Sequence, residues 1–278
     1  MFQRNKKEGT NWILSLISFG SIDIVVSVWG NLSFFSFYFQ NRLSSSLVLF
    51  YLVSVWTLYQ LDHLWDAKKE STPLSIRANF YVQNQIWIVA AMILSLAFSC
   101  YLGMTKEWDF LQSNQTYLVF FVFTIFLVVK QISPIPKEIL VSFFYTWGIF
   151  LPFSHGNDVW EIRLIFFLHV LANVLLTYQM DRDRDEKQNT FTLNRILSAL
   201  WMQRLVQTLF FLGVLLLVWS SIQGFLPMDF GLGMGFSYLW LFVASRYTKN
   251  PIERKVFLEL SYLPMFLPEI IFFFSGLR

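Results

Sequence analysis

Two pairs of aspartates have the residue type and spacing to do chemistry. Asp62 and Asp66 lie in "YQLDHLWDAKK" (residues 59–69), and Asp181 and Asp185 lie in "MDRDRDEK" (180–187). On a helix, side chains four residues apart share one face, about 5–6 Å apart at Cβ. Paired carboxylates suit Mg²⁺, a hard ion that commonly bridges protein carboxylates to substrate phosphate oxygens. We therefore predict that these four aspartates are metal ligands.

Basic residues are interleaved with both acidic pairs. Lys68 follows the first pair, and Arg182 and Lys187 lie within and just after the second. Guanidinium and ammonium groups are good donors to phosphate oxygens, so we predict that these three bind a diphosphate substrate. The alternative for all of these charges is a solvated helix end at a membrane edge.

The composition indicates which elements hold these residues. The chain has 278 residues, of which 55% are hydrophobic and 14% charged, and it contains 32 Phe and 11 Trp. Soluble domains carry about 25% charged residues, so the chain reads as an integral membrane protein. With roughly 20 residues needed for each crossing, the apolar runs predict a single all-α domain over 1–278, polytopic, with about nine transmembrane helices. The predicted spans are 11–30, 44–61, 85–104, 115–130, 138–153, 161–180, 198–222, 228–246 and 256–275.

The distribution of positive charge predicts the topology. Sixteen of the 21 Lys and Arg residues lie in or beside the N-terminus and the loops on its side of the membrane. Cytoplasmic loops carry such an excess, so we expect a multi-pass protein (of the inner membrane in a bacterium) with a cytoplasmic N-terminus. Four spans separate the two Asp pairs, so both pairs should face the cytoplasm.

Other classes of site lack support. The chain has no GxxxxGK[ST], no GxGxxG after a strand and no Cys/His metal spacing. The basic isoelectric point reflects the cytoplasmic loops, so no nucleic-acid partner is expected. Nothing in the sequence indicates an oligomeric state.

A polar stripe runs along the predicted span 161–180. His169, Asn173 and Thr177 recur every fourth residue and lead to Asp181. Polar groups inside a span usually face a cavity or a partner helix. Two interpretations stay open: hydrogen bonds between helices, or a cavity lining in which Asn173 binds substrate.

The two motifs resemble those of the UbiA superfamily of intramembrane prenyltransferases, which have nine helices around a central cavity. "DHLWD" is similar to the end of the family's NxxxDxxxD motif, and "DRDRDEK" is similar to its DxxxD motif. "FLVVKQISPIP" (126–136) resembles a YxxxK segment, with Phe126 for Tyr and Lys130 for Lys. The chain departs from the family at Leu58, where the first motif has Asn, unless Gln60 substitutes.

The resemblance implies transfer of a polyprenyl group from an allylic polyprenyl diphosphate to a lipophilic or aromatic acceptor within membrane lipid. It implies Mg²⁺ on Asp62, Asp66, Asp181 and Asp185, catalytic roles for Asp62 and Asp181, and a catalytic contact from Lys130 to the diphosphate. Aromatic faces such as those of Tyr59, Trp65 or Trp147 could each stabilise a developing carbocation by roughly 0.5–2 kcal/mol. The alternatives are a membrane transporter and a catalytically degenerate protein that binds prenyl diphosphate.

Overall fold

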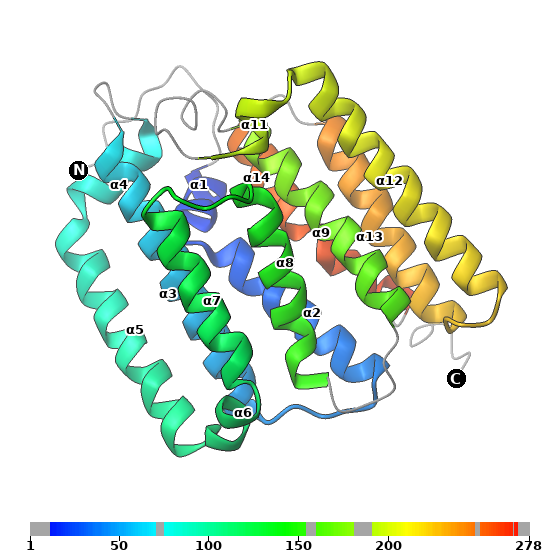
Figure 1. The fold of residues 1–278 in the computed structure, drawn as a ribbon, viewed down its shortest axis with the longest axis horizontal. Coiled ribbons are helices and arrows are strands. Elements are labelled where there is room, and N and C mark those ends of the chain that lie inside the picture. The colour runs from blue at the N-terminus through cyan, green and yellow to red at the C-terminus, as the bar shows by residue number, and fades with distance from the viewer. Residues whose placement is uncertain are drawn as a thin grey trace.

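The computed structural model describes residues 12–70, 75–153, 160–180, 191–247, 251–268 and 270–271, and within these ranges every regular element is a helix. Figure 1 shows long helices running side by side, with α5 and α12 at opposite edges and α8 and α9 between them. The α-helices are α1 (Trp12–Phe19), α2 (Ile22–Tyr38), α3 (Ser45–Lys69), α4 (Ile76–Gln83), α5 (Gln85–Thr105), α6 (Trp108–Ser113), α7 (Gln115–Val129), α8 (Lys137–Phe150), α9 (Trp160–Met180), α11 (Leu193–Ile196), α12 (Ala199–Ile222), α13 (Met228–Tyr247) and α14 (Pro251–Glu259). Two 3₁₀ helices are η1 (Leu151–Phe153) and η2 (Leu260–Phe266).

Four helices are long and apolar enough to cross a membrane: α3, α5, α9 and α12. The bent pair α1–α2 makes a fifth if it counts as one span, and α7 is a shorter apolar helix. The all-α class is thus confirmed for the described residues, in which four helices, or five with the bent pair, meet the length and apolarity needed for a span, against the nine predicted. The predicted spans 138–153 and 228–246 correspond to α8 with η1 and to α13.

The predicted first span, 11–30, is not one straight helix. It breaks at Gly20–Ser21, where α1 and α2 meet at 70° and Ser21 adopts a left-handed φ of 53°. Side chains from other helices satisfy the carbonyls at this break. The Trp56 indole donates to the Gly20 carbonyl at 2.9 Å, and the Tyr81 hydroxyl donates to the Phe19 carbonyl at 2.6 Å.

The predicted last span, 256–275, is likewise not a continuous α-helix. It begins inside α14 and passes at Leu260 into η2, which contains Pro264. Proline lacks a backbone N–H and clashes with the preceding helical turn. The chain therefore changes to tighter 3₁₀ geometry at this point.

Helix α9 forms the centre of the molecule. Two thirds (67%) of its most apolar 18-residue window is buried, against 28% for α3 and α12 and 17% for α5. Two hydrophobic clusters meet on it, one through Phe166 and Val170 and the other through Ala172 and Leu175. The ends of α9 are therefore held firmly in relation to the helices around it.

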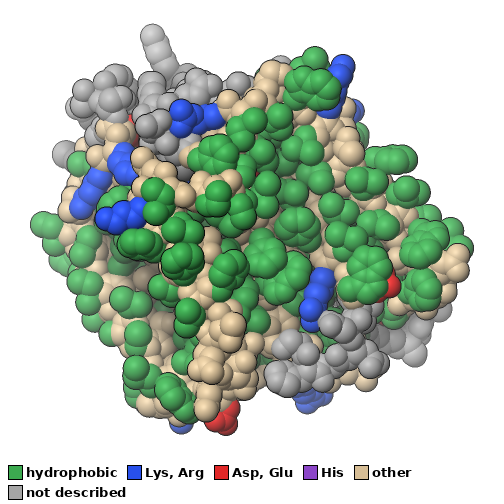
Figure 2. Space-filling model, in the orientation of Figure 1, with side chains coloured by type: hydrophobic (Ala, Val, Ile, Leu, Met, Phe, Trp, Pro, Cys, Tyr) green, Lys and Arg blue, Asp and Glu red, His purple; other side chains and the backbone are tan. Residues whose placement is uncertain are grey.

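The outer helices expose large apolar side chains. On α5, Ile86, Trp87 and Leu94 are each more than 70% exposed. Hydrophobic side chains cover most of the face shown in Figure 2. Contiguous apolar surface of this kind is typical of contact with lipid.

Candidate functional site

An ion pair joins the first Asp motif to the start of α8. The Lys137 ammonium donates to Asp62 Oδ1 at 3.0 Å, and the two side chains are 19% and 45% exposed. Lys137 is the first residue of α8, where a positive charge opposes the helix dipole. The carboxylate from α3 offsets that cost, so the pair fixes the start of α8 against the last turns of α3.

The surroundings keep Lys137 charged. Lys137 lies just outside the predicted span 138–153, and burial by itself lowers the pKa of its ammonium. The carboxylate of Asp62, together with Tyr178 and Asp66, raises the pKa by more, so that it lies well above its ordinary value. The ammonium also lies 5.7 Å from the centre of the Tyr178 ring on α9. Lys137 therefore connects α3, α8 and α9 at one end of the molecule.

The start of α8 also holds the segment that follows the second Asp motif. The buried Glu138 carboxylate accepts the Leu193 N–H at 2.9 and 3.0 Å, and the Lys137 N–H donates to the Phe191 carbonyl. The two flanks are joined to each other, because the Asn194 amide donates to the Tyr178 carbonyl at 2.9 Å. The segment 181–190 thus leaves and rejoins the described structure beside the Lys137–Asp62 pair. Four predicted site residues lie in that segment, outside the described residues: Asp181, Arg182, Asp185 and Lys187.

A tyrosine cluster lies on the inner side of the pair; it consists of Tyr59, Tyr145, Tyr178 and Tyr262. Tyr59 on α3 interacts electrostatically with Asp62 and with the Tyr145 and Tyr178 hydroxyls. The rings of Tyr145 on α8 and Tyr262 on η2 stack with centroids 5.7 Å apart. Four elements thus bring together one set of phenol rings, with their hydroxyl groups and negative π-faces.

The described half of the acidic site fits a hard cation. Among the described residues no three His, Cys, Asp or Glu side chains gather into a metal-binding group. Asp62 and Asp66 are nevertheless four residues apart on α3, and Asp62 is nearly half exposed. Mg²⁺ usually binds through one or two carboxylates together with substrate phosphates and water. Two carboxylates at the end of α3 meet that requirement.

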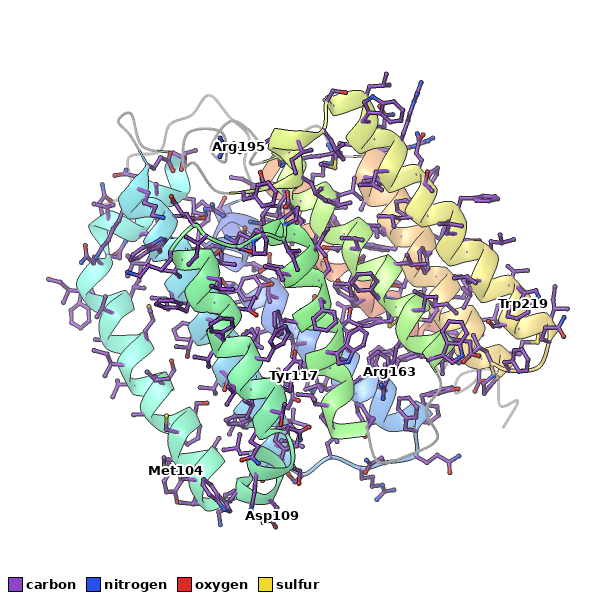
Figure 3. All side chains as sticks on the ribbon, in the orientation of Figure 1. Met104, Asp109, Tyr117, Arg163, Arg195 and Trp219 are labelled. Carbon is purple, nitrogen blue, oxygen red and sulfur yellow. The ribbon has the colours of Figure 1, made fainter. Side chains whose placement is uncertain are left out.

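Lys130 lies apart from the Asp62 carboxylate. It caps the end of α7, is exposed, and places its ammonium 5.9 Å from the centre of its neighbour Phe126. Helix α7 is tied to α8 further down, where the Tyr117 hydroxyl donates to the Phe144 carbonyl; Tyr117 is labelled in Figure 3. The sequence motif thus points to Lys130, whereas the structure puts the Lys137 ammonium on Asp62.

The remaining polar residues of the first motif face two directions. Lys68 is exposed in the last turn of α3, and Trp65 is 45% exposed with the Lys69 ammonium 4.9 Å from its ring. Gln60 is buried, and its amide donates to the Ser21 hydroxyl and the Phe19 carbonyl. Since Gln60 is committed to the α1–α2 break, it does not stand in for the family's Asn at position 58.

Two residues of the polar stripe of α9 form hydrogen bonds to other helices, whereas the Thr177 hydroxyl donates to the Val174 carbonyl of α9 itself. The Asn173 amide nitrogen donates to the Leu258 carbonyl at 2.6 Å and to the Ser261 hydroxyl at 3.1 Å. His169 Nε2 pairs with the Ser237 hydroxyl at 2.9 Å. Both N–H groups of the Asn173 amide are therefore engaged, and the stripe joins α9 to α13, α14 and η2.

Sequence reasoning missed Lys137 and the convergence of the tyrosines. A signal for Lys137 existed, because a lysine directly after "SPIP" begins a helix at the end where cations are least favourable. Such a lysine calls for an anionic partner. The convergence of the tyrosines has no counterpart in local sequence, since its members come from four separate elements.

Comparison with known proteins does not add to this geometry. No protein-family model matches the chain, and searches of curated proteins and of solved structures found no similar protein.

Proposed function

We propose that this chain is an intramembrane prenyltransferase that uses an allylic polyprenyl diphosphate as donor and a lipophilic or aromatic acceptor. The observation that carries the proposal is the Lys137–Asp62 pair, which adjoins Asp66, the tyrosine cluster and both flanks of the 181–190 segment. Charge for a diphosphate and aromatic surface for a cation are thus adjacent.

The charged end of the site would bind the diphosphate. Asp62 and Asp66, with Asp181 and Asp185 of the second motif, would hold Mg²⁺, which when bound neutralises charge on the leaving group. Lys137 is held in its charged form by its neighbours. Its ammonium is therefore available as a donor to diphosphate oxygens on the inner side of the acidic motifs. Lys68, Arg182 and Lys187 supply further positive charge at the rim.

The tyrosine cluster would stabilise the reacting carbon. The bond between the allylic carbon and the diphosphate oxygen breaks, and the diphosphate keeps the electron pair. A nucleophilic atom of the acceptor then bonds to that carbon and loses a proton to solvent. Aromatic faces near the carbon lower the energy of the positive charge by roughly 0.5–2 kcal/mol each. Water is excluded where Tyr262 is buried, and this protects the cation from hydrolysis.

The proposed topology is nine crossings with a cytoplasmic N-terminus. It rests on the asymmetry of Lys and Arg across the predicted loops. The proximity of Asp62 to the flanks of segment 181–190 supports placement of both motifs on one side. Cysteines introduced at 66 and 187 should react with the same side-specific reagent, and labelling from opposite sides would refute the shared site.

The decisive experiment measures transfer and diphosphate release together. Purified protein is incubated with Mg²⁺, a labelled prenyl diphosphate and a membrane lipid extract. We expect inorganic diphosphate and a labelled lipid in equal amounts, and neither in the presence of a chelator. Movement of intact donor across a proteoliposome would instead identify a transporter. Binding without release would identify a degenerate enzyme. Either outcome would overturn the proposal.

A further inference from the structure

A second feature lies on the far side of α9 from the tyrosine cluster. Helices α12 and α13 are antiparallel neighbours joined by a short turn, and a cavity of about 1210 Å³ runs between them with the end of α9 beside it. We call this cavity the α12–α13 groove. None of its lining residues belongs to the proposed prenyl site.

The groove is polar at one end and apolar along the rest. Its polar end joins the start of α12 to the end of α13, and it includes Gln203, Gln207 and Arg246, with Arg254 from α14. Towards the turn between the helices the wall is apolar, as at Val214, Val218 and Ile222. Trp219, which marks that end of α12 in Figure 3, does not line the groove.

The charge at the polar end is not balanced by the groove itself. Two arginines line it, and no Asp or Glu is among its lining residues. The Arg254 Nε is buried and, among the described residues, has no hydrogen-bond partner. The Arg246 guanidinium lies 4.2 Å from the centre of the Phe242 ring, also in the wall. Since a buried N–H without an acceptor is costly, this end of the groove is complementary to an anion.

The length of the apolar part of the groove indicates that the anionic group carries a long hydrocarbon chain. Helical rise gives about 18 Å from Phe210 to Ile222 along the apolar wall, which is close to the roughly 15 Å of hydrocarbon in one leaflet of a bilayer. Arg246 is in the last turn of α13, where a span meets the lipid headgroups. An anionic head with a long hydrocarbon chain therefore matches the groove in charge, depth and length.

We propose that the α12–α13 groove binds one anionic glycerophospholipid, with its phosphate on Arg246 and Arg254 and an acyl chain along the apolar wall. The site takes membrane lipid as a bound component and not as substrate. It does not rest on prenyltransferase activity, because no residue is shared with that site.

The headgroup test uses purified protein in detergent, with bound lipid counted by native mass spectrometry. We expect one phosphatidylglycerol per chain in preference to phosphatidylcholine. Arg246→Gln with Arg254→Gln should weaken phosphatidylglycerol binding by roughly fivefold for each arginine. Arg204→Gln is the matched control, because Arg204 is near the same end of α12, exposed, and outside the groove. Equal binding of both lipids, or an equal effect of the control, would overturn the proposal.

The chain test keeps the arginines. Val214→Trp places a large ring in the groove wall, whereas Leu215→Trp adds the same ring on the adjacent exposed position outside it. We expect Val214→Trp to lower binding of phosphatidylglycerol and Leu215→Trp to leave it unchanged. Cross-linking between cysteines at position 218 of two chains, with no lipid retained, would show that a second copy covers the groove and would refute the proposal.

Discussion

Two regions of this molecule carry cationic side chains, the partly buried Lys137 in one and the exposed Arg246 with the partly buried Arg254 in the other, and they balance the charge in opposite ways. Lys137 has a carboxylate of the same chain 3.0 Å away. Arg246 and Arg254 line a groove in which none of the described wall residues is Asp or Glu. The charge of Lys137 is balanced by a carboxylate of the folded chain. On the proposal above, the charge of the groove arginines is balanced only when an anionic lipid binds. An internal ion pair fixes helices and can exchange partners with substrate, while unbalanced arginines select an anionic ligand.

The difference determines what a mutation does. Removal of one partner of the Lys137–Asp62 pair leaves the other, partly buried charge without compensation, which weakens the fold as well as the site. Removal of a groove arginine relieves an unbalanced charge, so the fold should tolerate it and only lipid affinity should change. Mutations in the two regions therefore test whether each charge is balanced within the fold.

The largest expected effect comes from Asp62→Asn. Asparagine keeps the volume but removes a metal ligand and the partner of Lys137. We expect prenyl transfer to fall by about a hundredfold or more, the loss typical when a group that stabilises developing charge is removed. Diphosphate release under saturating Mg²⁺ measures it.

The double variant Asp62→Asn with Lys137→Met separates fold from chemistry. It removes both charges of the pair, so thermal stability should recover relative to Asp62→Asn while transfer stays low. Recovery of transfer in the double variant would show that Asp62 acts only by balancing Lys137.

The next largest effect is expected from the loss of Lys137, compared with the loss of Lys130 on the other side of the same turn. Lys137→Met should lower kcat/KM for the donor by about tenfold or more, as expected when a charge-assisted hydrogen bond to phosphate is lost. Lys130→Met is the matched control, because Lys130 is exposed and contacts Phe126. A loss in kcat would assign Lys137 to the leaving group, and a rise in KM alone would assign it to binding. If Lys130→Met has the larger effect, the catalytic lysine is Lys130, as the YxxxK-like segment predicts, and not Lys137, which contacts Asp62.

The pair of lysines also shows how far sequence reasoning reached. Long apolar runs located α3, α5, α9 and α12 to within a few residues, apart from the part of α3 that continues beyond residue 61, because length and apolarity are local properties. The choice between Lys130 and Lys137 depends on how α8 packs on α3. The break at Gly20–Ser21 depends on Trp56 and Tyr81, which are distant in sequence. Both the choice of lysine and the helix break depend on residues distant in sequence, so the periodicity of the local sequence could not predict them.

A smaller effect, on stability, is expected when two glycines near the groove are each replaced by alanine. A Cβ at Gly213 would collide with the hydroxyl of Tyr238, which is buried and donates to the Ile165 carbonyl at 2.7 Å. A Cβ at Gly235 would meet only Leu217 at an ordinary 3.8 Å. We expect Gly213→Ala to destabilise by about 1–3 kcal/mol through overpacking. Gly235→Ala should be neutral or stabilise slightly, since alanine favours helix. Thermal unfolding in one detergent measures both, and an equal loss in the two variants would mean that the groove is closed at Gly235.

The smallest effect is the pH dependence of the Lys137 contribution. The pKa of Lys137 is raised in the folded state above its ordinary 10.5. A raised lysine pKa means that its stabilising contribution is complete below the unfolded-state value and declines as pH rises through the folded-state value. The difference in stability between the wild type and Lys137→Met should therefore stay constant from neutral pH to about pH 10 and narrow only above it. Arginine does not deprotonate in proteins, so the lipid preference of the groove should stay constant across the same range. Parallel melting curves and lipid counts at stepped pH would measure both. If the contribution of Lys137 to stability already declined near neutral pH, Asp62 would not hold Lys137 in its charged form. Lys137 would then not be a cation that the fold balances, and its difference from the groove arginines would disappear.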